Sequence, residues 1–179
     1  MTVYALAGRR PDAPDAGTRR FPVENCGLVA GRIKRLFKEQ GATTLVSSAA
    51  CGADLLALGV AENLDIRRRI ILPLDASRFR TTSVTDRPGD WGPCFDAIIA
   101  RTEKDDDLII LSEQLTGYES YKAVNMAILD HAEKLKGPEE TIRICLVWEG
   151  APRADDDLTY QLALAARSKG WPVDEVLTL

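Results

Sequence analysis

The sequence predicts an α/β fold: a single, doubly wound, mostly parallel sheet with helices on both faces. Short apolar runs alternate with longer segments of helical periodicity along the whole chain of 179 residues. Several of these runs are apolar throughout, which is typical of strands that are covered on both faces of a sheet. No repeat, low-complexity tract or linker divides residues 1–179, so we expect one domain.

The order of the elements predicts a series of βαβ units. Strands are predicted from the apolar runs Val3–Ala7, Thr43–Ser47, Arg69–Leu74, Asp107–Leu111, Ile142–Trp148 and Val173–Leu177. Helices are predicted from the periodic segments Glu24–Gln40, Gly52–Asn63, Pro93–Lys104, Glu119–Lys136 and Asp155–Lys169. Glycine follows several of these helices as a stop, and aspartates at the start of the last one suit its N-terminal dipole. The stretch Asp75–Gly92 is predicted to be a long irregular loop, a kind of segment that is often functional.

Composition restricts the class of function. The net charge of -4 at pH 7 argues against general binding to nucleic acid or to an anionic membrane surface. No apolar run approaches the roughly 20 residues of a membrane span, and the N-terminal residues are typical of a strand rather than of a signal peptide. Four scattered cysteines and a single histidine predict neither a zinc site nor a disulfide framework. Scattered thiols favour a cytoplasmic location.

The turn Ser47–Asp54 is the main candidate for a binding site. In doubly wound sheets, ligands bind outside the carboxyl ends of the strands. The small residues from Ser47 through Ser48 to Gly52 leave backbone N–H groups accessible at a helix N-terminus, where an anion is favoured. The alternative is a turn that lets helix and strand pack closely. Asp54 is either a residue that complements the helix dipole or an acceptor for ribose hydroxyl groups.

Two further loops supply cations and aromatic rings. Gly8 allows a tight turn after the first strand, and Arg9 and Arg10 offer guanidinium forks for phosphate, unless they are solvated on the surface. In the long loop after the third strand, Arg78 is a candidate for phosphate binding. Asp90 and Trp91, at the end of the same loop, are candidate ligand contacts, with the ring available to stack on a base.

Later in the chain, Tyr121 and Asn125 share one face of a helix, and the Asn amide needs a partner if it is buried. That partner is either a ligand or a backbone group. Glu149 follows a predicted strand and is the best-placed single carboxylate; the alternative is that it caps the following helix or pairs with an arginine. If the protein is an enzyme, Glu149 and Asp54 are the expected catalytic residues.

Taken together, these segments resemble the SLOG superfamily, a Rossmann-like group that is related to LOG-type enzymes and to DprA. The resemblance runs through Ala7–Arg10, Ser48–Leu55, Leu72–Phe79, Thr82–Val84, Gly89–Trp91, Tyr121 with Asn125, Val147–Gly150 and Gly170–Val173. It implies a nucleotide-related ligand at the carboxyl ends of the strands. The chain lacks the PGGxGTxxE motif of LOG-type phosphoribohydrolases; the corresponding residues are Glu149–Thr159, in which Thr159 remains as a candidate ligand contact.

The expected function is therefore binding or sensing of a nucleotide or a nucleotide derivative. An alternative is a hydrolase or transferase that acts on the N-glycosidic bond of a nucleotide or nucleoside. Binding of single-stranded DNA is less favoured, because the chain is acidic and has no dense basic stripe. We expect no metal, no cofactor and no membrane partner, and by analogy with related domains we expect a homodimer.

Overall fold

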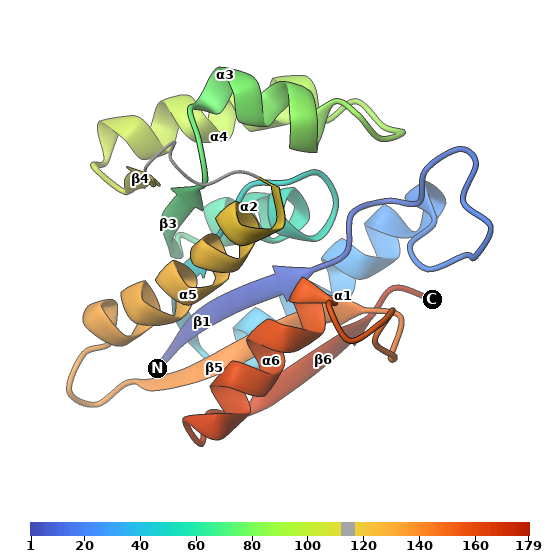
Figure 1. Cartoon of the computed structure of the whole chain (residues 1–179). Helices are drawn as coiled ribbons and strands as arrows, with labels where there is room; N and C mark the ends of the chain where they lie inside the picture. The colour runs from blue at the N-terminus through green and yellow to red at the C-terminus, as the bar shows by residue number, and fades with distance from the viewer. Residues whose placement is uncertain (112–116) are drawn as a thin grey trace.

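A computed structural model describes residues 1–111 and 117–179. Its centre is a six-stranded sheet in the order β4-β3-β2-β1-β5-β6, and every neighbouring pair is parallel (Figure 1). The strands are β1 (Thr2–Gly8), β2 (Ala42–Ser47), β3 (Arg67–Leu72), β4 (Leu108–Ile110), β5 (Thr141–Trp148) and β6 (Val173–Leu177). The predicted α/β class is confirmed, and the sheet is wholly rather than mostly parallel.

Helices cover both faces of this sheet. They are α1 (Cys26–Glu39), α2 (Ala53–Asn63), α3 (Ala76–Phe79), α4 (Gly92–Lys104), α5 (Gly117–Leu135) and α6 (Leu158–Ser168), with a 3-10 turn η1 (Val23–Asn25) and a π-helical turn η2 (Arg80–Val84). In Figure 1, α5 and α6 lie in front of the sheet and α1 lies behind it. This arrangement is the doubly wound architecture, with two helical layers around one sheet.

Strand β1 shows why the apolar runs are continuous. Tyr4 and Leu6 point into the core on the side of α1 and α2, whereas Val3, Ala5 and Ala7 point into the core on the side of α5 and α6. The Tyr4 ring also contacts Phe37 of α1, with 5.1 Å between centroids. Because successive side chains alternate between two buried faces, no position of the strand selects a polar residue.

Most element boundaries differ from the expectation by one to three residues, and three of the differences from the expected elements have a clear local reason. Strand β3 ends before Pro73, which has no N–H for the ladder. Helix α6 begins at Leu158 because Asp157 is its N-cap and accepts hydrogen bonds from the two backbone N–H groups that follow Leu158. The expected irregular loop Asp75–Gly92 was wrong in part, since it contains α3 and η2, and Asp75 caps α3.

The chain reverses its order at the centre of the sheet. From β1 it proceeds outward through β2, β3 and β4, and after α5 it places β5 on the other side of β1. The loops that follow β1 and β5 therefore separate in opposite directions. In doubly wound sheets this switch point is where a crevice forms at the carboxyl edge.

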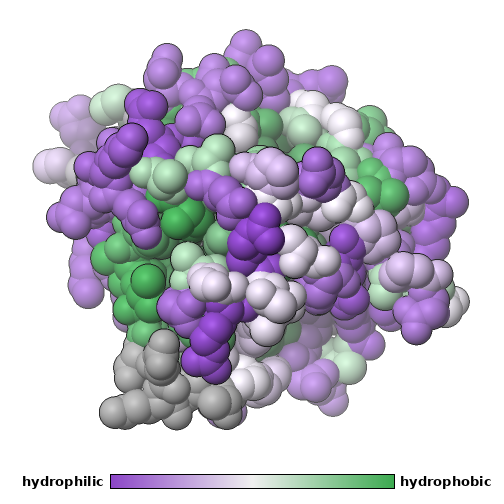
Figure 2. All heavy atoms as spheres, turned by 90° about the horizontal axis from the view of Figure 1, so that it is seen from above, coloured by the Kyte–Doolittle hydropathy of each residue, from purple (hydrophilic) through white to green (hydrophobic). Residues whose placement is uncertain are grey.

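The described surface is largely polar. Hydrophilic side chains cover most of the face in Figure 2, and a hydrophobic area interrupts them at the left. The exposed apolar residues Leu28, Met126 and Leu164 lie on three different helices. None of the described helices combines the length and apolar character needed to cross a membrane. The expected homodimer stays a prediction.

Candidate functional site

A cavity of about 730 Å³ opens at the switch point between β1 and β5. Its walls come from the loop after β1, the turn before α2, η2, the first half of α5 and the loop before α6. Several expected ligand residues line it: Gly8, Arg9, Arg10, Ser48, Asp54, Tyr121, Asn125 and Thr159. Others do not line it: Ser47, Gly52, Arg78, Asp90, Trp91 and Glu149.

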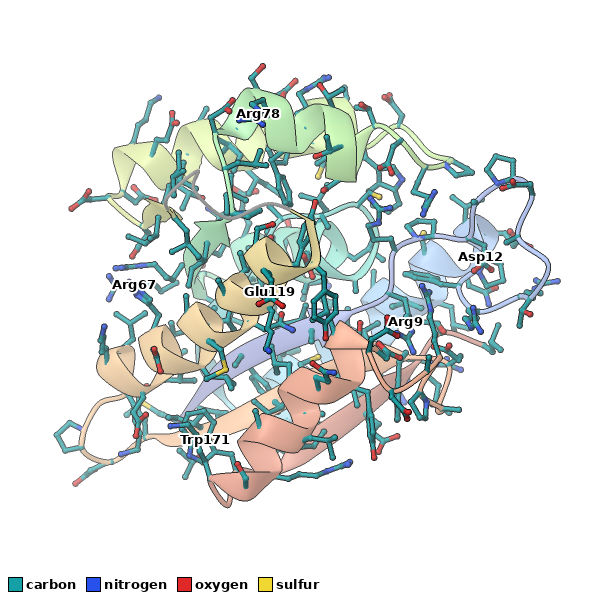
Figure 3. All side chains as sticks on the ribbon, viewed as in Figure 1. Arg9, Asp12, Arg67, Arg78, Glu119 and Trp171 are labelled. Atoms are coloured by element: carbon teal, nitrogen blue, oxygen red, sulfur yellow. The ribbon has the colours of Figure 1, made fainter. Side chains whose placement is uncertain are left out.

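Arg9 lines the cavity, but its guanidinium is committed to the protein. Its two terminal nitrogens each donate to an oxygen of Asp157 at 2.7 Å, and one of them also reaches the carbonyl of Ala151 at 3.1 Å. Its Nε donates to Glu149 at 2.6 Å. Both Arg9 and Asp157 are buried. Arg9 therefore fastens the loop after β5 to the end of β1, instead of offering a free fork to a phosphate (Figure 3).

Glu149 belongs to the same ion network. Besides Arg9, it pairs with Arg20 at 3.0 Å, and its side chain is only 11% exposed. Two guanidinium groups therefore hold the Glu149 carboxylate from both sides. The geometry supports the structural alternative for Glu149, an ion pair with arginine, over a catalytic role.

The turn before α2 differs from the open phosphate cradle that its small residues suggest. The backbone N–H of Cys51 donates to the carbonyl of Ser83 at 3.0 Å, and that of Ala53 donates to Arg9 at 3.1 Å. The N–H of Ala50 donates to the Asp54 carboxylate at 3.0 Å. These donors are therefore already satisfied within the protein, and a carboxylate occupies the position where an anion is favoured.

Glycine is required in this turn for close packing. Gly52 has φ +89°, and a Cβ there would meet Pro11 Cδ at 2.7 Å and the Arg9 carbonyl oxygen at 2.8 Å. A Cβ on Gly8 would collide with Ala53. Ser47 is buried and its hydroxyl donates to the Ser48 carbonyl at 2.8 Å. These small residues let the β1 loop lie against the start of α2, which was the alternative interpretation of the turn.

Asp54 is a buried carboxylate in the cavity wall that forms no ion pair with a described residue. The residue is 8% exposed, and its hydrogen bond from Ala50 is the only one it accepts among the described residues. Burial raises the pKa of Asp54 to about 7, although the Ala50 N–H and the charge of Arg10 oppose this shift. A carboxyl group that titrates near neutral pH inside a cavity can donate or accept a proton.

The loop after β3 contributes less than expected. Trp91 is buried, and its ring N–H donates to the Pro88 carbonyl at 2.7 Å, so it pins the loop and does not offer a face for stacking. Phe79 is fully buried and stacks on Phe95 at 6.1 Å. Arg78 lies on α3 at the top of the molecule in Figure 3, whereas Arg9 lies in the loop after β1.

Helix α5 brings the face that carries Tyr121 and Asn125 to the cavity. The Tyr121 hydroxyl and the Ser83 hydroxyl are 2.8 Å apart, which joins α5 to η2. The Asn125 side-chain amide donates to the Leu158 carbonyl at 2.8 Å, so its partner is a backbone group. The apolar residues Val124 and Ile128 line the cavity from the same helix.

Sequence reasoning missed three cations of the cavity wall: Arg20, which pairs with Glu149, and the two arginines Arg87 and Arg153. Arg87 follows η2 and is half-buried, and Arg153 lies in the loop after β5 and is exposed. Neither side chain makes a hydrogen bond or an ion pair with any described residue. The available signal was their position in loops that follow strands β3 and β5. The segment 13–20, which also lines the cavity, gave no sequence signal.

The described residues do not suggest thiol or metal chemistry. Burial raises the pKa of the Cys51 thiol to about 12, and all four cysteines are free thiols. Within residues 1–111 and 117–179, no three His, Cys, Asp or Glu side chains come together to hold a metal ion. In comparisons of the sequence with protein-family models and with curated proteins, nothing matches the chain.

Proposed function

We propose that this protein binds a nucleotide or a nucleotide derivative in the cavity at the switch point. The observation that carries the proposal is that one cavity is lined both by Arg87 and Arg153, whose guanidinium groups form no ion pair with a described residue, and by the buried carboxyl group of Asp54. Nucleotides combine an anionic phosphate, a hydroxylated sugar and an apolar base. The cavity offers cations, a hydroxyl acceptor and the apolar side chains of Val124 and Ile128 for these three parts.

Size and position also support this ligand class. A volume of about 730 Å³ lies within the range of roughly 300–1,000 Å³ that is usual for small-molecule sites. The carboxyl edge of a doubly wound sheet, at the switch point, is the usual place for such a ligand. The resemblance of the sequence to the SLOG superfamily implies the same ligand class independently of the cavity.

Titration calorimetry on the full chain tests the proposal. Nucleoside mono-, di- and cyclic phosphates are titrated in turn, and at least one is expected to give saturable heat. Ser48→Phe, which fills the cavity wall, is expected to abolish this heat, whereas Arg19→Gln on the exposed surface is expected to retain it. Thermal unfolding shows whether each variant is folded. Absence of heat from every nucleotide contradicts the proposal.

Asp54 favours hydrolysis of an N-glycosidic bond as a second candidate function. In that reaction the Asp54 carboxylate removes a proton from a water molecule, the water oxygen bonds to C1′ as the C1′–N bond breaks, and the resulting carboxylic acid passes the proton to the leaving base. A pKa of about 7 suits this proton transfer. Release of free base from nucleoside monophosphates, measured by chromatography, is expected to disappear in Asp54→Asn. Absence of base release by the wild-type chain restricts the function to binding.

A further inference from the structure

Both helices that begin at the cavity carry their own carboxylate at that end. Asp54 lies in the first turn of α2 and accepts from the Ala50 N–H at 3.0 Å. Asp157 caps α6 and accepts from the backbone N–H groups of Arg153 at 2.8 Å and Thr159 at 3.1 Å. A phosphate at either helix end would lack these donors. It would also meet a nearby negative charge whenever the carboxyl group is ionised.

The cations that remain for an anion are side chains in loops. Arg87 comes from the loop between η2 and α4, and Arg153 from the loop between β5 and α6. Partial burial and the neighbouring guanidinium groups of Arg9 and Arg20 lower the pKa of Arg153. A bound anion would relieve this repulsion. The charges of Glu149 and Asp157 act on Arg153 in the opposite sense, but among the described residues no carboxylate forms an ion pair with the side chain of Arg87 or Arg153.

Exposure separates these cations from the buried carboxyl group. Arg153 is exposed, Arg87 is half-buried, and Asp54 is only 8% exposed. The cavity thus has an outer part with the two guanidinium groups and the exposed Asp156, and an inner part with Asp54 and the half-buried Ser48. The inner part suits a neutral group with several hydroxyls, because a carboxylate accepts hydrogen bonds from a vicinal diol without charge repulsion.

We propose that the ligand enters with its ribose toward Asp54 and its phosphate toward Arg87 and Arg153 at the opening of the cavity. This orientation rests on the proposed function, and it reverses the usual arrangement in which a phosphate sits on a helix N-terminus. It defines the ligand class as a nucleoside with its phosphate directed outward. Inorganic phosphate alone reaches only the outer arginines and lacks the inner contacts.

The test compares nucleosides, their 5′-monophosphates and inorganic phosphate by calorimetry on the full chain. In Arg87→Gln/Arg153→Gln, the affinity for the monophosphate is expected to fall by roughly 10- to 100-fold, since charge-assisted hydrogen bonds are lost, while nucleoside affinity stays within about twofold. Asp54→Asn is expected to weaken nucleoside and monophosphate alike by about tenfold. Inorganic phosphate is expected to bind weakly and to depend on the two arginines.

Two results overturn the orientation while leaving the proposed function intact. One is that the arginine double variant binds the monophosphate as tightly as the wild-type chain does. The other is that Asp54→Asn binds the monophosphate more tightly, as a phosphate at the start of α2 requires. Failure of the wild-type chain to bind any nucleoside or nucleotide overturns the proposed function itself, and the orientation with it. Arg19→Gln, paired on the surface with Glu24, controls for general charge effects.

Discussion

Replacing Arg9 with methionine is expected to destabilise the fold strongly, because it leaves two carboxylates without their main cation. Methionine keeps most of the length of the aliphatic stem but removes the hydrogen bonds to Asp157, Glu149 and the Ala151 carbonyl. Glu149 retains its pairing with Arg20. Asp157, whose side chain is 3% exposed, retains only backbone donors.

The magnitude follows from the burial of the pair. The side chains of Arg9 and Asp157 are 2% and 3% exposed, so solvent screens their interaction little. Removing one partner of such a pair costs about 3–5 kcal/mol of unfolding free energy. In the matched control, Arg19→Met, the ion pair to Glu24 is 65% and 63% exposed. Its loss is expected to cost less than about 0.5 kcal/mol.

The cost is expected to depend on pH in a defined direction. Burial alone raises the pKa of Asp157, but hydrogen bonds from Arg9 and from backbone N–H groups bring the pKa below its ordinary value. This lowered pKa contributes stability above the unfolded value of about 3.9, and the contribution is lost as the pH falls through the folded value. Without Arg9 the folded pKa rises. Asp157 then becomes protonated at a higher pH. The difference in unfolding free energy between Arg9→Met and the wild-type chain therefore becomes smaller as the pH falls from 7 toward 4.

Urea unfolding followed by tryptophan fluorescence measures this cost at both pH values. Asp157→Asn provides the internal check, because asparagine still caps α6 but carries no charge. It is expected to destabilise the wild-type chain at pH 7 and to stabilise Arg9→Met. If Arg9→Met costs no more than Arg19→Met, or if Asp157→Asn has the same sign in both backgrounds, the assignment of Arg9 as the central fastener is refuted.

Two further predictions concern the turn before α2. Asp54→Asn is expected to stabilise the fold by roughly 2–4 kcal/mol at pH 8. Because burial raises the folded pKa to about 7, wild-type stability falls as the pH rises from 4 to 7, whereas urea midpoints of the variant should lack this slope. Gly52→Ala is expected to destabilise by about 2 kcal/mol or more, since φ is +89° and Pro11 blocks the Cβ. Gly59→Ala, in open space within α2, should instead stabilise by about 0.5–1 kcal/mol, and equal thermal shifts for both glycines would contradict this.

The fold was predictable because its signals are local. The alternation of Tyr4 and Leu6 with Val3 and Ala5 between two cores produces a run without polar residues, which indicates a parallel strand covered on both sides. Strand β3 begins two residues earlier than expected. Arg67 lies in this extension and pairs with Asp107 at 2.9 Å on the neighbouring chain segment. A partner 40 residues away cannot be read from the local pattern.

The location of the site was predictable, but the roles of its residues were not. The rule for strand ends selected the loops that hold Arg10 and Ser48, helical spacing pointed to Asn125, and these three residues line one cavity. The commitment of Arg9 could not be predicted in the same way. Its carboxylate partners lie 140 and 148 residues further along the chain, and only the parallel pairing of β1 with β5 brings them together.

An aspartate near the start of a helix has two opposite interpretations: it marks a site for an anionic ligand, or it occupies that site itself. The helix dipole favours both a side-chain carboxylate and a ligand phosphate, so the two compete for the same donors. Before α2 the Asp54 carboxylate accepts from the Ala50 N–H, and at α6 the Asp157 carboxylate accepts from the Thr159 N–H. Recognition of an anion, on our proposal, therefore moves from backbone N–H groups to the side chains of Arg87 and Arg153. Because solvent reaches these arginines, nucleotide affinity should fall with rising salt, whereas nucleoside affinity should not.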